Sequence, residues 1–144
     1  MVKYRTMQID DYDGALALWQ SADGVQLRSA DSREGIARYL TRNPGLSFVA
    51  ESGGKVVGTI MAGHDGRRGY IQHLAVKAQS RNAGIGSELL RRCLATLKQA
   101  GIGKSHVHIL SDNHIAREFW IARGWELRDD IDVFSFVNDG DDNA

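Results

Sequence analysis

The chain has 144 residues, of which 42% are apolar and 25% charged, a composition typical of one globular domain with a buried core. Lys and Arg number 18 and Asp and Glu number 18, so the net charge of zero argues against a general affinity for nucleic acid or an anionic membrane. The single cysteine excludes an internal disulfide and a zinc cluster, and together with the absence of a signal peptide or long apolar run it predicts a cytoplasmic protein.

The first half of the chain predicts a strand, two helices and a β-hairpin, in that order. Asp10 or Asp11 can cap the first helix. Asp31 and Glu34 have the spacing of a capping box and predict the start of the second helix, which Asn43-Pro44-Gly45 ends. We expect the strands of this half over residues 2–8, 46–51 and 56–62.

The second half alternates strands with helices, which is typical of a parallel crossover. We expect strands over residues 70–76 and 104–110, helices over 84–100 and 113–123, and a final pair of strands within 125–137. The predicted fold is therefore α/β, with the element order βααβββαβαββ and helices on both faces of one mixed sheet. Residues 1–138 are expected to form a single domain, and residues 139–144 an acidic, disordered tail.

The most informative segment follows the strand at 70–76, where a polar turn leads into a helix that begins with two glycines. Backbone N–H groups at a helix N-terminus suit a phosphate, and Gly84 and Gly86 let a ligand approach the backbone closely. Arg81 can add its charge, and Asn82 tolerates a left-handed conformation. The segment lacks the lysine of a Walker loop and the third glycine of a dinucleotide fingerprint, which excludes both of these phosphate-binding motifs.

These residues resemble a known family at two motifs. Arg81-Asn82-Ala83-Gly84-Ile85-Gly86 is similar to the acetyl-CoA motif Arg/Gln-x-x-Gly-x-Gly/Ala of the GNAT superfamily of N-acetyltransferases. The segment from Asn113 to Trp125 is similar to the family's Asn-x-x-Ala-x-x-Phe-Tyr-x-x-x-Gly-Phe. The resemblance covers nearly the whole chain and is greatest to small bacterial members that consist of this domain alone.

The resemblance implies acetyl-CoA as co-substrate, with no metal. It implies that the pantetheine arm pairs with the strand and contacts Asn113, that the pyrophosphate lies on the glycine turn, and that the thioester enters a slot where two strands splay apart. The implied coenzyme-binding residues are Leu74, Ala75, Val76, Arg81, Asn82, Ala83, Gly84, Ile85, Gly86, Ser87 and Asn113.

Three side chains are candidates for the chemistry of the site. The strand at 104–110 alternates, so His106 and His108 share one face, and similar family members carry glutamate at the position of His108, five residues before the motif asparagine. His108 is therefore a candidate general base, and His73, beside the expected slot, is a second; each can instead be a structural histidine. Trp120 stands where the family often has a tyrosine that protonates the leaving thiolate, and an indole cannot do so.

The function that the resemblance implies is direct acetyl transfer from acetyl-CoA to a primary amine in a ternary complex. The acceptor is a small molecule, a protein N-terminus or a lysine, and the family suggests a homodimer. Nucleic acid and membrane partners are not expected. The alternative is a non-catalytic acyl-CoA-binding or regulatory module, a function that the replacement of the tyrosine by Trp120 favours.

Overall fold

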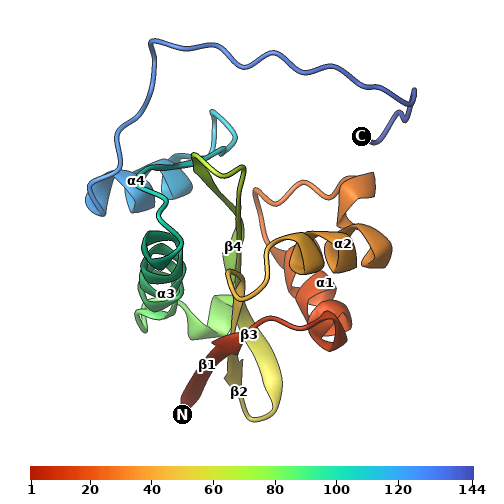
Figure 1. The fold of residues 1–144 in the computed structure, drawn as a ribbon. Helices are drawn as coiled ribbons and strands as arrows, with labels where there is room; N and C mark the ends of the chain where they lie inside the picture. Colours follow the sequence, from red (N-terminus) through yellow and green to blue (C-terminus); the bar gives the residue numbers. More distant parts are fainter. The chain divides into compact units, whose positions relative to one another are not determined.

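The computed structural model describes residues 1–144, which divide into two compact units, Met1–His108 and Ile109–Ala144. The first unit contains one five-stranded sheet with the strands in chain order (Figure 1). The strands are β1 (Val2–Thr6), β2 (Phe48–Ser52), β3 (Lys55–His64), β4 (Gly69–Val76) and β5 (Ser105–Val107). Neighbouring strands are antiparallel except β4 and β5, which are parallel, as the predicted crossover requires.

Helices cover both faces of this sheet, which confirms the predicted α/β fold (Figure 1). On one face lie α1 (Tyr12–Ser21) and α2 (Arg33–Arg42), and on the other α3 (Ile85–Gln99). Three short 3₁₀ turns precede these helices: η1 (Ile9–Asp11), η2 (Ser29–Asp31) and η3 (Ala78–Ser80). None of the helices has the length and apolar character that a membrane span requires.

The packing of each face fixes the helices against the sheet. Trp19 of α1 is fully buried in a cluster with Val49 and Met61 from the sheet and Ala75 of β4. On the opposite face Gly58 of β3 lets α3 approach closely, because a Cβ there would lie 3.0 Å from Ile85 and 3.1 Å from Leu89. The first turn of α3 is thereby held against the middle of the sheet.

A β-bulge interrupts β4 at its centre. Thr59 pairs with Ala75 and Met61 with Gln72, so two residues of β4, His73 and Leu74, lie opposite one residue of β3. His73 has a φ of +49°, which is rare for a residue other than glycine. The bulge coincides with the end of the β4–β5 ladder, whose last pair is Ile71 with Val107. Beyond Ile71, β4 pairs with β3 alone, and its other edge is open.

Strand β5 is shorter than the sequence predicts. The predicted strand over residues 104–110 is formed only from Ser105 to Val107, so the expectation that His108 lies on the same strand as His106 is wrong. Its ladder with β4 ends at the pair of Ile71 with Val107, next to the bulge, so the residues after Val107 have no partner strand. His108 follows the strand as an exposed residue.

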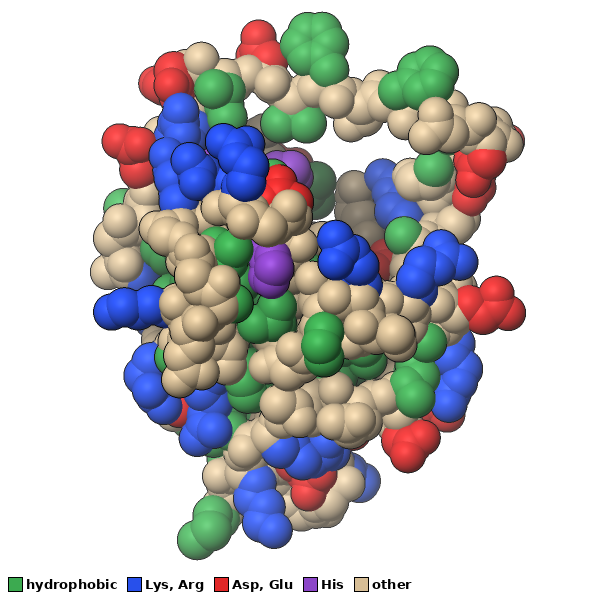
Figure 2. Space-filling model, viewed as in Figure 1, with side chains coloured by type: hydrophobic (Ala, Val, Ile, Leu, Met, Phe, Trp, Pro, Cys, Tyr) green, Lys and Arg blue, Asp and Glu red, His purple; other side chains and the backbone are tan.

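The Ile109–Ala144 unit contains one helix, α4 (His114–Ala122), whose first turn is capped by the side chain of Asn113. The two strands predicted within residues 125–137 are not formed, because no neighbouring strand pairs with this segment. Its apolar side chains are exposed, including Phe134 at 92% and Phe136 at 86%. Figure 2 colours the hydrophobic side chains of the chain green.

Candidate functional site

The turn between β4 and α3 presents a row of unpaired backbone donors. Asn82 and Gly84 have positive φ values of 64° and 78°, and the N–H groups from Asn82 to Gly86 form no hydrogen bond within the chain. Successive N–H groups in such a conformation form a concave site for an anion, and the N-terminus of α3 adds its positive dipole end. No side chain caps α3, so this end of the helix is available to a ligand.

The role of Gly84 in this turn is conformational. A Cβ at Gly84 would meet nothing within 4 Å, so its position leaves room for a side chain. A glycine suits this position because its φ of +78° lies in the left-handed region that L side chains rarely adopt.

Charged side chains beside the turn favour an anion. Arg81 is exposed and donates from Nε to the carbonyl of Val76 at 3.3 Å, which leaves its terminal nitrogens for a ligand. Glu88, in the first turn of α3, would repel an anion, but Arg91 and Arg92 each bind it at 2.7 Å. The hydrogen bond from Arg91 contributes most to lowering the pKa of Glu88, to about 2.

The open edge of β4 leads directly into this turn. Leu74, Ala75 and Val76 lie on it, beyond the last pair with β5. Backbone groups on an open strand edge can pair with an extended ligand as with an added strand. The structure therefore brings together in the Met1–His108 unit the strand residues predicted for the pantetheine arm and the turn residues predicted for the pyrophosphate.

His73, at the bulge, is held by neighbours from three elements. Its Nε2 lies 2.6 Å from Oδ1 of Asp31 in η2, and its ring lies 4.7 Å from that of Trp19 in α1. Its carbonyl accepts a hydrogen bond from the Thr59 hydroxyl at 2.8 Å, and that hydroxyl accepts one from Trp19 Nε1 at 2.9 Å. The side chain of His73 is only 15% exposed.

His108, the other candidate base, is not held by neighbouring side chains. His108 is exposed, and its side chain makes no hydrogen bond, ion pair or ring contact. Its neighbour His106 lies in β5 and contacts the ring of Tyr70 at 5.9 Å. The two candidate bases therefore differ in how firmly the fold orients them.

The Ile109–Ala144 unit holds the two remaining candidates. Oδ1 of Asn113 accepts the N–H of Ala116 at 3.1 Å, so its amide nitrogen stays available for a ligand. Trp120 is 6% exposed and packs edge-on against Trp125 and Phe119, with ring centroids 4.6 Å and 5.3 Å away. Its indole fills an apolar, aromatic environment.

Sequence reasoning missed Asp31 as part of this site. The spacing to Glu34 indicated a helix cap, but Ser32 caps α2 by accepting the N–H of Gly35 at 3.1 Å. The carboxylate of Asp31 is thereby free to bind His73. No spacing in the sequence relates residues 31 and 73, so only the tertiary fold reveals the pair.

Comparison with known families agrees with these features. Residues 12–125 match the model of the acetyltransferase (GNAT) family. The chain is 31% identical over 130 residues to an acetyltransferase of Sodalis glossinidius, covering 90% of this chain and 91% of the relative. It is 33% identical over 112 residues to an acetyltransferase of Pectobacterium atrosepticum, covering 78% and 79%.

A solved structure shares the fold. The PaiA N-acetyltransferase of Thermoplasma acidophilum, in complex with coenzyme A, superposes with a TM-score of 0.79. The match covers 90% of this chain and 92% of that one at 16% identity.

Proposed function

Because the chain belongs to the GNAT family of acetyltransferases, which take their acetyl group from acetyl-CoA, we propose that it transfers this group directly to a primary amine within a ternary complex. One observation carries the proposal. The bulge at His73, the open edge of β4 and the unpaired donors before α3 follow one another along the chain in the order that an extended coenzyme needs.

The coenzyme pose follows from this order. The N–H groups of residues 82–86 bind the pyrophosphate, and Arg81 adds a charge-assisted contact. The pantetheine arm pairs with Leu74 and Val76 as an added strand. The thioester then reaches the bulge, where β4 and β5 diverge.

The chemistry is attack by a neutral amine on the thioester carbonyl. Backbone N–H groups of β4 polarise the carbonyl oxygen, and binding both substrates together supplies orientation. A covalent acyl-enzyme on cysteine is disfavoured, because Cys93 is buried and its thiol donates to the Leu46 carbonyl at 3.0 Å. Burial raises the pKa of this thiol to about 12, which leaves it a poor nucleophile.

The leaving thiolate takes its proton without help from Trp120. An indole N–H is a donor but not a usable acid at neutral pH. A thiol has an ordinary pKa of about 8.5, so its thiolate is a tolerable leaving group that water can protonate.

The test is thiol release from acetyl-CoA with a panel of amines: spermidine, kanamycin, a free amino acid, a peptide with a free N-terminus and a lysine peptide. We expect turnover with at least one of them and formation of the matching N-acetyl product by mass spectrometry. Coenzyme binding without turnover on any amine would instead favour the non-catalytic acyl-CoA-binding module.

The coenzyme pose is tested separately with Arg81→Ala. Loss of one charge-assisted contact is expected to weaken coenzyme A binding by about 1.5–3 kcal/mol in isothermal titration, roughly 10- to 100-fold. Lys98→Ala is the matched control, since Lys98 is an exposed cation at the other end of α3. Equal affinities of the two variants would show that Arg81 does not touch the coenzyme.

A further inference from the structure

Asp31 is held in place by hydrogen bonds that do not involve His73. Its Oδ2 accepts the N–H of Arg28 at 2.9 Å, and the Tyr12 hydroxyl donates to its main-chain carbonyl at 2.7 Å. The side chain is 12% exposed. Burial alone would raise the pKa of Asp31, but the hydrogen bonds from His73 and the Arg28 N–H outweigh burial and lower it. Asp31 is therefore a carboxylate in a single, defined position.

This carboxylate determines which ring nitrogen of His73 carries the proton. An ionised carboxylate only accepts hydrogen bonds, so Nε2, 2.6 Å from Oδ1, carries the proton in the neutral ring. The other nitrogen, Nδ1, then has a lone pair, and it has no hydrogen-bond partner in the chain. A base oriented by a third group in this way is the arrangement of catalytic His–Asp pairs in general.

The groups that contact His73 include one charged side chain, that of Asp31. Trp19 from α1 and Thr59 from β3 are uncharged, and Asp31 from η2 is the charged side chain in contact with the ring. From β5, His106 contacts Tyr70. Gly69 faces α3, because a Cβ there would meet Leu97. Side chains alternate along a strand, so Tyr70 faces the opposite side of the sheet, which carries α1 and α2. His106, the partner of Tyr70 in β5, faces the same side.

We propose that Asp31 is a positioning residue that holds His73 as the Nε2–H tautomer, so that Nδ1 of His73 accepts the proton of the acceptor ammonium. This inference rests on the proposed acetyl transfer. It selects His73 over His108, because a proton acceptor must be held in reach of its proton and only His73 is held.

The transfer conserves protons and electrons. Nδ1 takes one proton from R–NH₃⁺, and the resulting neutral amine forms a bond to the carbonyl carbon. The C–S bond then breaks, and its electron pair leaves on sulfur. The amide nitrogen loses its second proton, which ends on the thiolate, and His73 releases the first proton to solvent. Asp31 stays ionised throughout and stabilises the charged imidazolium that forms.

The first test needs no acceptor. Nitrogen-15 NMR of the His73 side chain in the intact protein reports which ring nitrogen carries the proton. We expect the Nε2–H tautomer in the wild type. In Asp31→Asn the amide can turn its NH₂ toward Nε2, so we expect the Nδ1–H tautomer to gain population. A wild-type ring protonated at Nδ1 would overturn the proposal without any variant.

The second test is the pH–rate profile with the best amine of the panel. In Asp31→Asn we expect turnover to fall at least about 10-fold, within the range of general base catalysis, with the KM for acetyl-CoA unchanged. The acidic limb of kcat/KM should move to lower pH, and Asp31→Glu should restore part of the rate. In His73→Gln the rate should follow the fraction of neutral amine, so part of the lost rate should return at high pH. Glu34→Gln, which removes an exposed carboxylate from the first turn of α2, is the control and should behave as wild type.

The outcomes separate the two proposals. If the tautomer changes in Asp31→Asn but neither Asp31→Asn nor His73→Gln alters the profile, His73 is not the base, and acetyl transfer by the wild type still stands. If the wild type acetylates no amine, the proposed function fails, whatever the NMR result. An unchanged tautomer and an unchanged rate in folded Asp31→Asn would overturn the role of Asp31.

Discussion

The hydroxyl of Thr59 joins α1, β3 and β4 at the bulge. It accepts a hydrogen bond from Trp19 Nε1 and donates one to the carbonyl of His73, so each of its polar functions is used. Thr59 and Trp19 are both 0% exposed. Since water cannot reach these groups, the hydroxyl is needed to satisfy them. It also restrains the backbone of His73 in its left-handed conformation.

Replacing this hydroxyl tests its contribution. Thr59→Val keeps the shape but leaves the indole N–H and the carbonyl without a partner, so we expect the free energy of unfolding to fall by about 2–3 kcal/mol. Thr59→Ser, the matched control, keeps the hydroxyl and loses one methyl group, at a cost of about 1 kcal/mol. Urea unfolding followed by fluorescence gives both values. A Val variant as stable as the Ser variant would contradict this reasoning.

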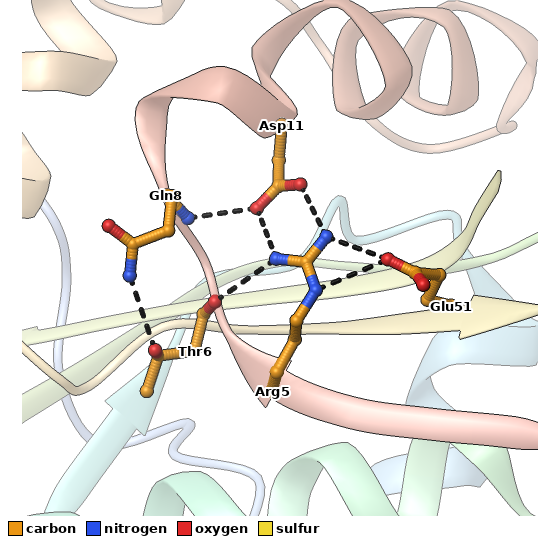
Figure 3. Close-up of polar contacts among 5 residues, drawn as sticks. All are labelled: Arg5, Thr6, Gln8, Asp11 and Glu51. Atoms are coloured by element: carbon orange, nitrogen blue, oxygen red, sulfur yellow. Dashed lines mark hydrogen bonds and ion pairs between the residues drawn. The ribbon is translucent and has the colours of Figure 1, made fainter. Parts of the chain in front are cut away.

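The first strand and the start of the first helix are joined by an ion cluster, which Figure 3 shows. Arg5 of β1 binds both carboxylate oxygens of Asp11 in η1, at 2.7 and 2.8 Å, and Glu51 of β2 at 2.9 Å. Asp11 also accepts the N–H of Gln8 at 2.9 Å. Because α1 follows Asp11 directly, this cluster sets where the helix begins, and α1 carries Trp19 to the bulge.

This cluster should make stability depend on pH. Burial raises the pKa of Asp11, but the hydrogen bonds from Arg5 and from the Gln8 N–H together lower it by more than burial raises it, so the net shift is downward. Because the pKa of Asp11 is lower in the folded state than in the unfolded state, its ionised carboxylate stabilises the fold at any pH above its ordinary pKa. This stabilisation is lost as the pH falls through the pKa of the folded state. We expect Arg5→Met to cost about 1–2 kcal/mol at pH 7, reduced by the partial exposure of Arg5, and this difference from wild type to shrink below about pH 4.

Denaturant unfolding between pH 7 and pH 2.5 measures that difference directly. Arg38→Met is the control, because Arg38 is an exposed arginine of α2 with no carboxylate partner. Its difference from wild type should be small at every pH. A deficit of Arg5→Met that persisted unchanged in acid would mean that packing of the arginine stem, and not the ion pair with Asp11, stabilises this corner.

Local sequence patterns predict the order of the elements up to α4 and the glycine turn, because periodicity and turn chemistry are local. Local patterns cannot predict the bulge at His73, because it is a register shift between two strands and depends on what packs against them. Asp31 was misassigned because its capping-box spacing to Glu34 favoured it over the adjacent Ser32, which is the cap in the structure. That residues 1–138 act as one domain stays a prediction.

Coenzyme A bound at the turn before α3 should stabilise the folded protein. Its pyrophosphate donors, the β4 edge and His73 all belong to the Met1–His108 unit. A ligand that binds only the folded state stabilises it by RT ln(1 + [L]/Kd), about 2.7 kcal/mol at 100 times Kd. Coenzyme A should therefore raise the melting temperature of the Met1–His108 unit, provided the turn keeps its conformation.

Gly84 provides the sharpest test of that turn. A Val side chain would enter open space, but its β-branch disfavours the φ of +78°, so the turn should rearrange and disperse its N–H groups. Asn is the matched substitution, because it adds a side chain of similar size and tolerates the left-handed region. We expect Gly84→Val to bind coenzyme A at least about 10-fold more weakly than Gly84→Asn. This difference in affinity removes about 1.4 kcal/mol of the stabilisation that the ligand provides.

Thermal melts of both variants with and without coenzyme A measure this difference, and the ligand-free melts show whether each variant is folded. If Gly84→Val gains as much stability from coenzyme A as Gly84→Asn, the pyrophosphate does not lie on the turn before α3.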